Sequence, residues 1–367
     1  MTVGLLPALG SGIRALAETG QQSRLIDGYM RPYADAFGEV LYFSYRPESL
    51  GEFPSERALL DRVRVVAPER PMSRARRAVG MVGAHATEFR RCRVLRAFQI
   101  TGVIPAIRAK RRFGIPYVTT YGFWYAQLSE PGPKRVLKAV VERLGLRHAA
   151  AVIATTEELR ARAARLASRV ELIPNGVDLR LFRPWDSGRS ERGRILYVGR
   201  FSPEKNLATV VAAAALVGDG ATLRLAGSGP LRAQLDAQAR VRGVPVEFLG
   251  VVEQTRLPAV YASSDVFVLA SFTEGHPKVL LEAMACGLPC VASDCAGNRS
   301  LITEGETGLL FDPHQPEALA ACLRRIFGNP ALAARLGKAA REMVVARYDL
   351  SALVAREIAL VREIAEG

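Results

Sequence analysis

Short apolar runs rich in β-branched residues alternate with helix-like segments along the whole chain, and this alternation limits the fold more than any other feature. In the first half the predicted strands are Val3–Leu9, Val40–Tyr45, Val63–Ala67, Tyr117–Thr120, Ala151–Ala154 and Val170–Ile173. The helix-like stretches between them include Gln22–Phe37, Gly102–Phe113 and Pro133–Leu146. Apolar strands separated by helices are typical of parallel sheets covered on both faces.

The second half repeats the alternation. Its predicted strands are Arg194–Val198, Ala221–Ala226, Val246–Leu249, Val266–Ala270, Pro289–Ala292 and Gly308–Phe311. Its predicted helices are Asn206–Leu216, Pro230–Arg242, Pro258–Ser263, Pro277–Ala285 and Pro316–Phe327. The segment Pro174–Asp186, rich in Pro, Gly and Asp, separates the halves. We therefore predict an α/β fold with two doubly wound parallel-sheet (Rossmann-like) domains, residues 1–175 and 176–350, facing a cleft.

The last helix, about residues 351–367, is expected to pack back on the first domain. Ligands of doubly wound sheets bind at the carboxyl ends of the strands, so the cleft is the expected site. A hydrophobic fraction of 49% excludes global disorder, and no apolar run approaches the ~18 residues of a membrane span. The N-terminal segment lacks a basic region before its apolar residues and predicts a strand rather than a signal peptide. The five cysteines show no CxxC spacing, which favours small buried side chains in a reducing cytoplasm over a metal site.

The net charge of +14 lies entirely in the first half. Residues 1–183 contain 30 Lys and Arg against 16 Asp and Glu, a net of +14, whereas residues 184–367 contain 20 of each. The excess concentrates in three clusters, which are Arg74, Arg76 and Arg77; Arg90, Arg91, Arg93 and Arg96; and Arg108, Lys110, Arg111 and Arg112. One such cluster is typical of a solvated helix face, but three together favour an anionic partner such as a membrane surface or a phosphorylated acceptor. No nucleic-acid-binding signature occurs, so nucleic acid is not expected as a partner.

The loop after the predicted strand Arg194–Val198 carries two cations. Gly199 ends the strand, and Arg200 and Lys205 precede the helix that opens near Asn206. A helix dipole disfavours positive charge at its start, so a purely structural role for both cations is unusual. Arginine offers a planar fork and lysine a point charge, and both suit a diphosphate. A second turn after a strand, with Gly227 in the string LAGSGPLR, has a composition that many such turns share.

The stretch SFTEGHPKVLLEAMACGLPCVASD, residues 271–294, is mostly apolar yet holds Glu274 and Glu282 with seven residues between them. Pro277 begins a predicted helix, and the backbone N–H groups of its first turn form an anion site. These N–H groups belong to Lys278, Val279 and Leu280. The apolar neighbours of Glu282 indicate a buried helix, in which a carboxylate needs a partner. Two carboxylates flanking an anion site suit a ligand with a central phosphate and hydroxyls at both ends, and a nucleotide-sugar has that layout.

Several segments resemble one enzyme family. The string EGHPKVLLEAMACGLPCVAS resembles the E-x7-E signature of the retaining GT-B glycosyltransferases of family 4. VGRFSPEKN resembles the phosphate-binding loop of that family, IPNGVDLRLF the segment that opens its second domain, and ATTEELR the strand and turn before it. The resemblance covers about residues 148–330, while the first half is similar in architecture alone. It implies a GT-B fold and transfer of a sugar from a nucleotide-sugar to an acceptor, either a lipid-linked or a cell-envelope glycan.

The resemblance also implies residue roles. Arg200 and Lys205 would hold the donor diphosphate, Glu274 the sugar hydroxyls and Glu282 the ribose hydroxyls. Arg200, Lys205 and Glu274 are the expected catalytic residues. The other expected donor-binding residues are Gly10 and Gly12 after the first strand, Gly199, Gly227, Val251 beside the base, Gly275, His276, Pro277, Lys278 and Val279.

Three positions depart from the family pattern, and one of them is Ser300, which stands where a glutamate is common. Tyr121 stands where many relatives carry a histidine near the reacting sugar. His276 replaces a residue that is usually smaller or apolar, and it faces either the donor sugar or the helix start, with the helix cap favoured.

The expected reaction retains the anomeric configuration, with the leaving phosphate as the base, and needs neither a tightly bound cofactor nor a metal, since no Asp-x-Asp occurs. The expected partners are the nucleotide-sugar, a glycan or lipid-linked acceptor, and the anionic cytoplasmic face of a membrane. Two alternatives remain: a nucleotide-sugar 2-epimerase of the same architecture, which needs acid and base side chains, and a non-catalytic binding module.

Overall fold

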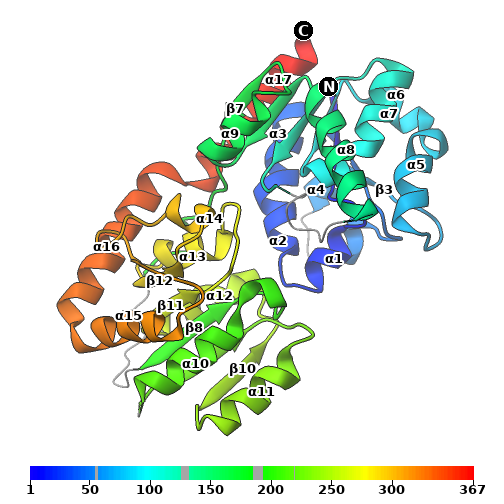
Figure 1. The fold of residues 1–367 in the computed structure, drawn as a ribbon. Helices are drawn as coiled ribbons and strands as arrows, with labels where there is room; N and C mark the ends of the chain where they lie inside the picture. The colour runs from blue at the N-terminus through cyan, green and yellow to red at the C-terminus, as the bar shows by residue number, and fades with distance from the viewer. Residues whose placement is uncertain (54–56, 125–131, 185–192, 219) are drawn as a thin grey trace. The chain divides into compact units, whose positions relative to one another are not determined.

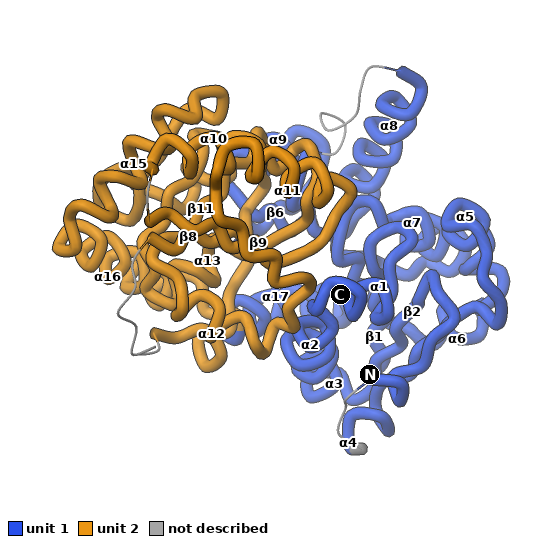
Figure 2. The backbone as a smooth tube through the Cα atoms, turned by 90° about the horizontal axis from the view of Figure 1, so that it is seen from below, with its two compact units in different colours: residues 1–174, 351–367 blue, residues 175–350 orange. Residues whose placement is uncertain are grey.

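The computed structural model describes residues 1–53, 57–124, 132–184, 193–218 and 220–367. The chain divides into two compact units, shown in different colours in Figure 2. Unit 1 comprises residues 1–174 and 351–367, and unit 2 comprises residues 175–350. The division lies one residue before the boundary expected from the sequence. Trp185 and Asp186, at the end of the expected linker segment, lie outside the described residues.

Unit 1 is built on a parallel sheet whose described strands follow the order β3-β2-β1-β4-β5-β6-β7 (Figure 1). The strands are β1 (Thr2–Leu6), β2 (Glu39–Phe43), β3 (Val63–Val66), β4 (Val94–Ala97), β5 (Tyr117–Tyr121), β6 (Ala151–Ala154) and β7 (Val170–Leu172). The winding reverses between β1 and β4, where Val3 pairs with Val94. Ligands of doubly wound sheets bind at such a reversal.

Helices cover both faces of the unit 1 sheet because neighbouring strand residues enter different cores. Leu41 and Phe43 belong to one core, whereas Val40 and Tyr42 belong to the other. The first face is covered by α5 (Arg74–Ala84), α6 (Ala86–Arg91), α7 (Val103–Phe113), α8 (Pro133–His148) and α9 (Glu157–Ala163). The second is covered by α1 (Ile13–Ala17), α2 (Gln22–Leu25), the π-helical turn η1 (Ile26–Met30), α3 (Arg31–Phe37), α4 (Arg57–Leu60) and α17 (Leu350–Glu366).

Strand β4 is absent from the sequence prediction because its arginine belongs to an apparent surface cluster. The structure places Arg96 within the sheet, with 2% of its side chain exposed. Its guanidinium donates to both carboxylate oxygens of Glu357 on α17, at 2.8 and 2.9 Å. The hydroxyl of Tyr33 donates to the same carboxylate at 2.7 Å. The charge is tolerated inside the sheet because it is paired and hydrogen-bonded.

Arg77 is a second arginine of the basic clusters that lies inside unit 1, although the three clusters are expected to face an anionic partner. It is buried, and its guanidinium donates to the backbone carbonyls of Ser44 and Val66 at 3.1 Å each. Two of the clustered arginines, Arg77 and Arg96, therefore stabilise the fold of unit 1 and are not available to a partner.

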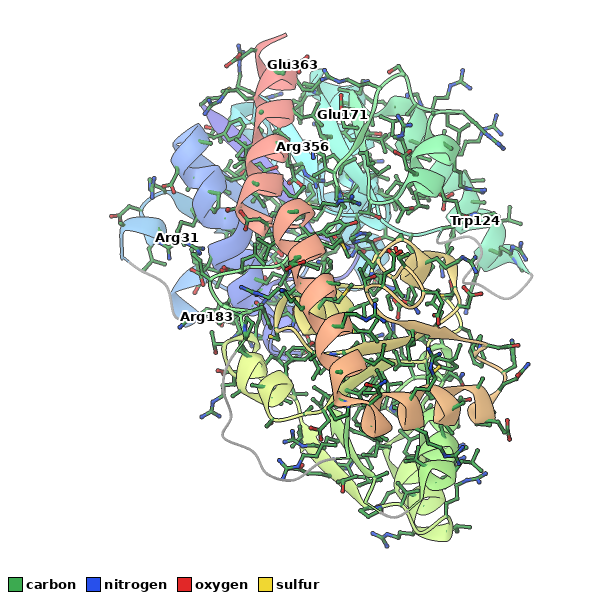
Figure 3. The ribbon with its side chains drawn as sticks, turned by 90° about the vertical axis from the view of Figure 1, so that its left-hand side faces the viewer. Arg31, Trp124, Glu171, Arg183, Arg356 and Glu363 are labelled. Carbon is green, nitrogen blue, oxygen red and sulfur yellow. The ribbon has the colours of Figure 1, made fainter. Side chains whose placement is uncertain are left out.

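Helix α17 is held to unit 1 along its length. Its Arg356 donates to the carbonyl of Leu172 at 3.0 Å, and Glu363 pairs with Arg169 at 2.6 Å. Figure 3 labels Arg356 and Glu363 along α17, next to Glu171 of β7. Together with the buried pair in the middle of the helix, these contacts fix the last part of the chain on the unit that the first part builds.

Unit 2 contains a second parallel sheet, with the described strands in the order β10-β9-β8-β11-β12-β13 (Figure 1). They are β8 (Arg194–Val198), β9 (Thr222–Ala226), β10 (Val246–Gly250), β11 (Val266–Leu269), β12 (Cys290–Ser293) and β13 (Leu309–Phe311). The winding reverses between β8 and β11, where Val266 pairs with Ile195. The carboxyl ends of these two strands are therefore the expected ligand site of the unit.

The helices of unit 2 pack around one continuous core. They are α10 (Leu207–Val217), α11 (Arg232–Val241), α12 (Leu257–Ala262), α13 (Lys278–Ala285), α14 (Ala296–Arg299), α15 (Pro316–Gly328) and α16 (Pro330–Arg347). The long helix α16 is not among the predicted helices. The cysteines are free, and all except the half-buried Cys286 are buried, as expected for small apolar side chains. In the described ranges, no helix is both long and apolar enough to cross a membrane.

Candidate functional site

The two predicted charged loops of unit 2 meet at the reversal of its sheet. Lys205 follows β8, Glu274 follows β11, and Lys205 Nζ lies 2.6 Å from Glu274 Oε1. Ser271 donates its hydroxyl to the same oxygen at 2.7 Å. The side chains are 24% and 11% exposed, so the pair is accessible but largely shielded from water. A lysine has three N–H donors, so Lys205 can keep this carboxylate and still bind a second anion.

The chain positions this ion pair through Asn206, which is in the left-handed conformation at φ 53°. The side-chain amide of Asn206 donates to the carbonyl of Ala270 at 3.2 Å and to that of Pro313 at 2.8 Å. The backbone N–H of Phe272 donates to the carbonyl of Glu204 at 3.0 Å. The loops after β8 and β11 are thus tied together on both sides of the ion pair.

Gly297, at the start of α14, packs directly under the loop that carries Glu274. A Cβ atom at Gly297 would lie 2.4 Å from the carbonyl oxygen of Glu274 and 2.6 Å from that of Gly275. Both contacts are with backbone atoms, which cannot turn aside as a flexible side chain can. The absence of a side chain at Gly297 therefore allows the Glu274 loop to pack closely against the start of α14.

We expect Gly297→Ala to displace the Glu274 loop and to lower enzymatic activity by at least about tenfold, since small displacements of positioned groups are costly. Gly328→Ala is the matched control, because Gly328 also lies in a helix of unit 2 and a Cβ there meets no atom within 4 Å. Steady-state kinetics of both variants, with melting temperatures to show that each is folded, test this prediction. Equal activity of the two variants would contradict it.

The glycine turns after β8, β9 and β10 pack on one another. Gly227 has a φ of +134°, and a Cβ there would lie 1.9 Å from the carbonyl oxygen of Gly199. The N–H of Gly227 donates to the carbonyl of Gly250 at 2.6 Å. Val251 follows directly, with 43% of its surface exposed. The structure therefore brings Gly199, Gly227 and Val251 to one edge of the unit 2 sheet, as their positions after strands predict.

Arg200 differs from Lys205 in having an exposed side chain. Its backbone carbonyl accepts a hydrogen bond from Tyr197 at 2.9 Å, which fixes the loop. Among the residues that the structure describes, its guanidinium has no ion-pair partner. An exposed cation without a partner at the carboxyl end of β8 keeps all its donors for an anionic ligand.

Helix α13 begins at Lys278, with Pro277 at the N-cap, and no described side chain caps it. Its eight residues carry Glu282 in their interior, with a side chain that is only 1% exposed. The hydroxyl of Tyr261 on α12 donates to Glu282 Oε2 at 3.1 Å. A buried carboxylate needs a hydrogen-bond partner, and Tyr261 is that partner for Glu282. Because Glu282 is buried, it could contact a ligand only if neighbouring side chains moved.

His276 does not cap α13, so the favoured interpretation of this residue is wrong. Its side chain is buried, and its Nδ1 atom has no hydrogen-bond partner among the described residues. The ring lies 5.3 Å from the ring of Tyr348, and the side-chain amide of Asn175 donates to the His276 carbonyl at 2.7 Å. Burial, together with the charge of Lys278, lowers the pKa of His276 to about 4.

This low pKa predicts that the stability of unit 2 falls as the pH is lowered from about 6.5 to about 4. In that interval the unfolded chain binds a proton at His276 that the folded chain does not bind. The loss should reach about 3 kcal/mol by pH 4. His276→Phe keeps the ring but removes the titration, so urea unfolding of this variant should depend less on pH. The same pH dependence in both proteins would contradict the assignment.

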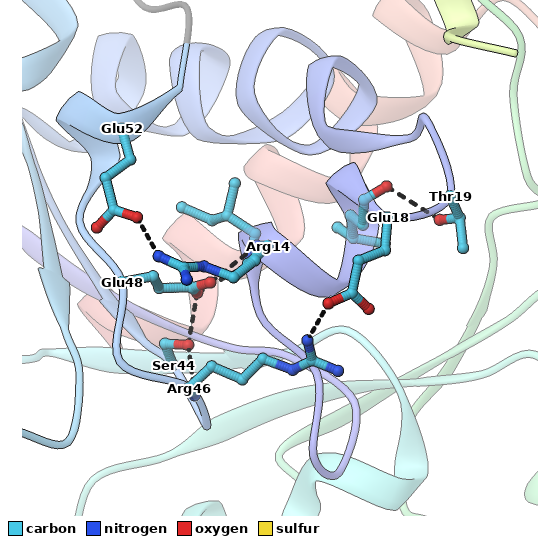
Figure 4. Close-up of polar contacts among 9 residues, drawn as sticks. Arg14, Glu18, Thr19, Ser44, Arg46, Glu48 and Glu52 are labelled. Carbon is cyan, nitrogen blue, oxygen red and sulfur yellow. Dashed lines mark hydrogen bonds and ion pairs between the residues drawn. The ribbon is translucent and has the colours of Figure 1, made fainter. Parts of the chain in front are cut away.

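The predicted glycine turn of unit 1, with Gly10 and Gly12, leads into α1 and meets a carboxylate of the chain itself (Figure 4). Glu48 accepts the backbone N–H groups of Ile13 and Arg14 at 2.8 Å each, and Ser44 donates to it at 2.5 Å. A Cβ at Gly12 would lie 2.5 Å from Glu48 Oε1. The start of α1 is therefore already satisfied by an anion, which the sequence does not indicate.

Tyr121, which stands where relatives carry a histidine, is fully buried. Its hydroxyl donates to Glu142 at 2.8 Å and accepts from Arg162 at 3.0 Å. Burial, with Glu142 next to it, raises the pKa of the phenol far above its usual value. These contacts give Tyr121 a structural role within unit 1.

Five residues that are not predicted from the sequence hold the predicted residues or their loops in place. They are Ser271, which bonds Glu274; Asn206, which ties the two loops; Tyr261, which bonds Glu282; Gly297, which packs under the Glu274 loop; and Glu48, which fills the start of α1. Only Asn206 carries a sequence signal, because asparagine is the residue that most readily replaces glycine in the left-handed conformation. The others are recognised by contacts between distant segments.

Comparison with known proteins agrees with this architecture. The sequence model of the family described as "Glycosyl transferases group 1" matches residues 183–343, and that of "Glycosyl transferase 4-like domain" matches residues 11–176. Sulfoquinovosyl transferase SQD2 of Arabidopsis thaliana is 32% identical over 53% of this chain and 40% of its own length. The chain spans about half the length of the curated relatives it matches.

Two solved structures share the fold over 99% of this chain. One is sucrose-phosphate synthase from Thermosynechococcus elongatus, with a TM-score of 0.82 and 23% identity, of whose chain 99% is covered. The other is Anabaena HepE in complex with UDP-glucose, with a TM-score of 0.80 and 19% identity, of whose chain 99% is also covered. Between them, the two family matches account for most of unit 1 and of unit 2. The chain therefore belongs to the GT-B glycosyltransferases of the family 4 type.

Proposed function

We propose that this glycosyltransferase moves a sugar from a nucleotide-diphosphate sugar to an acceptor bound by unit 1, with the anomeric configuration retained. The observation that carries the proposal is the ion pair between Lys205 and Glu274 at the reversal of the unit 2 sheet. Lys205 is a cation suited to a phosphate, Glu274 is a carboxylate suited to sugar hydroxyls, and one hydrogen bond connects them. The uncapped start of α13, four residues after Glu274, adds backbone N–H donors.

In the proposed complex Arg200 and Lys205 hold the donor diphosphate. Arg200 contributes a guanidinium that has no ion-pair partner among the described residues, and Lys205 contributes the donors that Glu274 leaves open. Glu274 accepts hydrogen bonds from the donor sugar. Glu282, oriented by Tyr261, accepts hydrogen bonds from the ribose after a local rearrangement. Gly199, Gly227, Val251, Gly275, Pro277, Lys278 and Val279 supply the backbone surface along the donor.

The reaction breaks the bond between the anomeric carbon and the phosphate oxygen, and the nucleoside diphosphate leaves with the bonding electrons. The acceptor hydroxyl attacks from the same face and gives its proton to the leaving phosphate. Negative charge therefore develops on the diphosphate, where the two cations and the helix start stabilise it without reorganisation. We propose that these groups replace a divalent metal, in agreement with the absence of Asp-x-Asp from the sequence.

The names of relatives support a nucleotide-sugar donor and a lipid-linked acceptor. The HepE structure holds UDP-glucose, and a mycobacterial relative, 31% identical over 211 residues, is named a GDP-mannose-dependent phosphatidylinositol monomannoside mannosyltransferase. We propose a glycan or lipid-linked glycan as the acceptor class.

A donor screen tests this proposal. A nucleotide-sugar that binds the folded chain should raise its melting temperature, and the same donor should be consumed when acceptors are added. NMR of the product should show the donor's anomeric configuration, and excess EDTA should leave the rate unchanged. Conversion of the donor without acceptor would favour the epimerase, and donor binding without turnover across an acceptor panel would favour a binding module.

A further inference from the structure

The first half of α8 is exposed although it carries large apolar side chains. Every residue from Gly132 to Val140 is exposed, a segment we call the α8 tip. Val136 and Leu137 are each 64% exposed, and Val140 is 47% exposed. Figure 2 shows this part of α8 extending beyond the other helices of unit 1.

The base of α8, by contrast, is firmly packed. Val141 and Leu144 lie against the core of unit 1, and Tyr117 donates to the carbonyl of Gly145 at 2.8 Å. A Cβ at Gly145 would lie 2.7 Å from the side chains of both Ile100 and Val103. The tip is therefore the exposed continuation of a helix whose base is anchored in the core.

The apolar residues of the tip form one face. At the angular spacing of an α-helix, Val136, Val140 and Leu137 fall within an arc of about 100°. The same arc continues into Leu144, which packs on the core. At the base of α8 this apolar stripe covers the core of unit 1, and on the tip the stripe continues beyond that core.

The charges on the tip are all positive. Lys134, Arg135 and Lys138 lie on it, and residues 132–141 contain no Asp or Glu. The acidic residue of α8, Glu142, is buried in the base, where Tyr121 donates to it. On the helix circumference Lys134 lies about 60° and Lys138 about 100° from Leu137, outside the apolar arc and on the side nearest to Leu137. The long side chain of Lys134, the nearer of the two lysines, can extend its charge while its methylene groups follow the apolar face.

We propose that the α8 tip docks on an anionic phospholipid bilayer. An apolar helix face with lysines beyond one side of it fits the boundary between headgroups and acyl chains, where apolar side chains insert and cations meet the anionic headgroups. The absence of acidic residues on the tip is complementary to such a surface. This inference goes beyond the proposed reaction and stands without it, although an acceptor anchored in the same bilayer would then lie next to unit 1.

Cosedimentation of the full chain with liposomes tests the proposal. Binding is expected to phosphatidylglycerol–phosphatidylcholine vesicles at low salt, with a loss of at least tenfold at high salt and on pure phosphatidylcholine. The double substitution Val136→Asp with Leu137→Asp should weaken binding at least tenfold, and so should Lys134→Glu with Lys138→Glu. The matched control is Val241→Asp on α11 in unit 2, where Val241 is 89% exposed.

Three outcomes would overturn the proposal: no binding at low salt, equal binding to neutral vesicles, or equal binding of the control and the α8 variants. The experiment also separates docking from donor binding. The α8 variants should keep their thermal shift with the nucleotide-sugar, which shows that they are folded. Lys205→Ala should still sediment with the anionic vesicles even where its donor binding is lost.

Discussion

Replacing Glu357 with alanine is expected to lower the free energy of unfolding by about 3–5 kcal/mol. The substitution leaves the Arg96 guanidinium inside the sheet, 2% exposed, without the carboxylate that pairs with it at 2.8 Å. It also removes the acceptor of the Tyr33 hydroxyl. A buried charge that loses its partner retains the full cost of leaving water. Urea unfolding followed by circular dichroism measures the change.

Two further variants separate the buried charge from loss of packing at α17. In Arg96→Leu with Glu357→Leu, both charges are gone, and most of the lost stability should return. In Glu363→Ala, an exposed pair with Arg169 on the same helix is removed, and little change is expected. If the double variant were as unstable as Glu357→Ala, the unpaired charge would not be the cause.

Replacing Lys205 with alanine is expected to lower kcat/KM by about 100- to 1,000-fold. The variant loses the cation that the structure places beside Glu274 and that the proposed reaction uses to stabilise the departing diphosphate. Because this charge develops during the reaction, kcat should fall in addition to any rise in KM. Steady-state kinetics with the donor found in the screen give both constants.

Lys338→Ala is the matched control for this substitution. Lys338 lies on α16 of the same unit, is 79% exposed and has Glu342 as its partner at 3.9 Å. Its removal should leave the kinetics unchanged. Lys205→Arg should recover part of the activity, since it restores the charge but not its geometry. Wild-type kinetics in a folded Lys205→Ala protein would exclude the proposed function, whatever the result with liposomes.

The strands of unit 2 follow closely from the sequence, although the long helix α16 is missing from the prediction. The predicted strand Arg194–Val198 coincides with β8, and the helix predicted from Pro277 is α13. The exception in unit 1, β4, shows why prediction fails where it does. Its sequence, VLRA, carries an arginine that follows Arg93 of a basic cluster by three positions, and the partner that makes it a buried strand residue lies 261 positions away. Periodicity within a short window contains no information about that partner.

The candidate site also has features that the sequence predicts and features that it does not. The residue types of Lys205, Glu274 and Glu282, and their positions after strands or inside a helix, can be read from the sequence because strand, turn and helix are local patterns. That Lys205 and Glu274 touch cannot be read, since they are 69 residues apart. The same holds for the support of Gly297 under the loop and for the partner of Glu282.

The sequence by itself determined the two-unit α/β architecture and placed the charged loops at strand ends, because alternating apolar patterns and helix start signals act over a few residues. Only the tertiary structure decided what each charge does. Arg77 and Arg96 became interior supports, Glu48 took the start of α1, and Lys205 met Glu274 at the reversal of a sheet. The physical reason is that the fate of a charge depends on its burial and its partner, and both are set by segments that the fold brings together from distant parts of the chain.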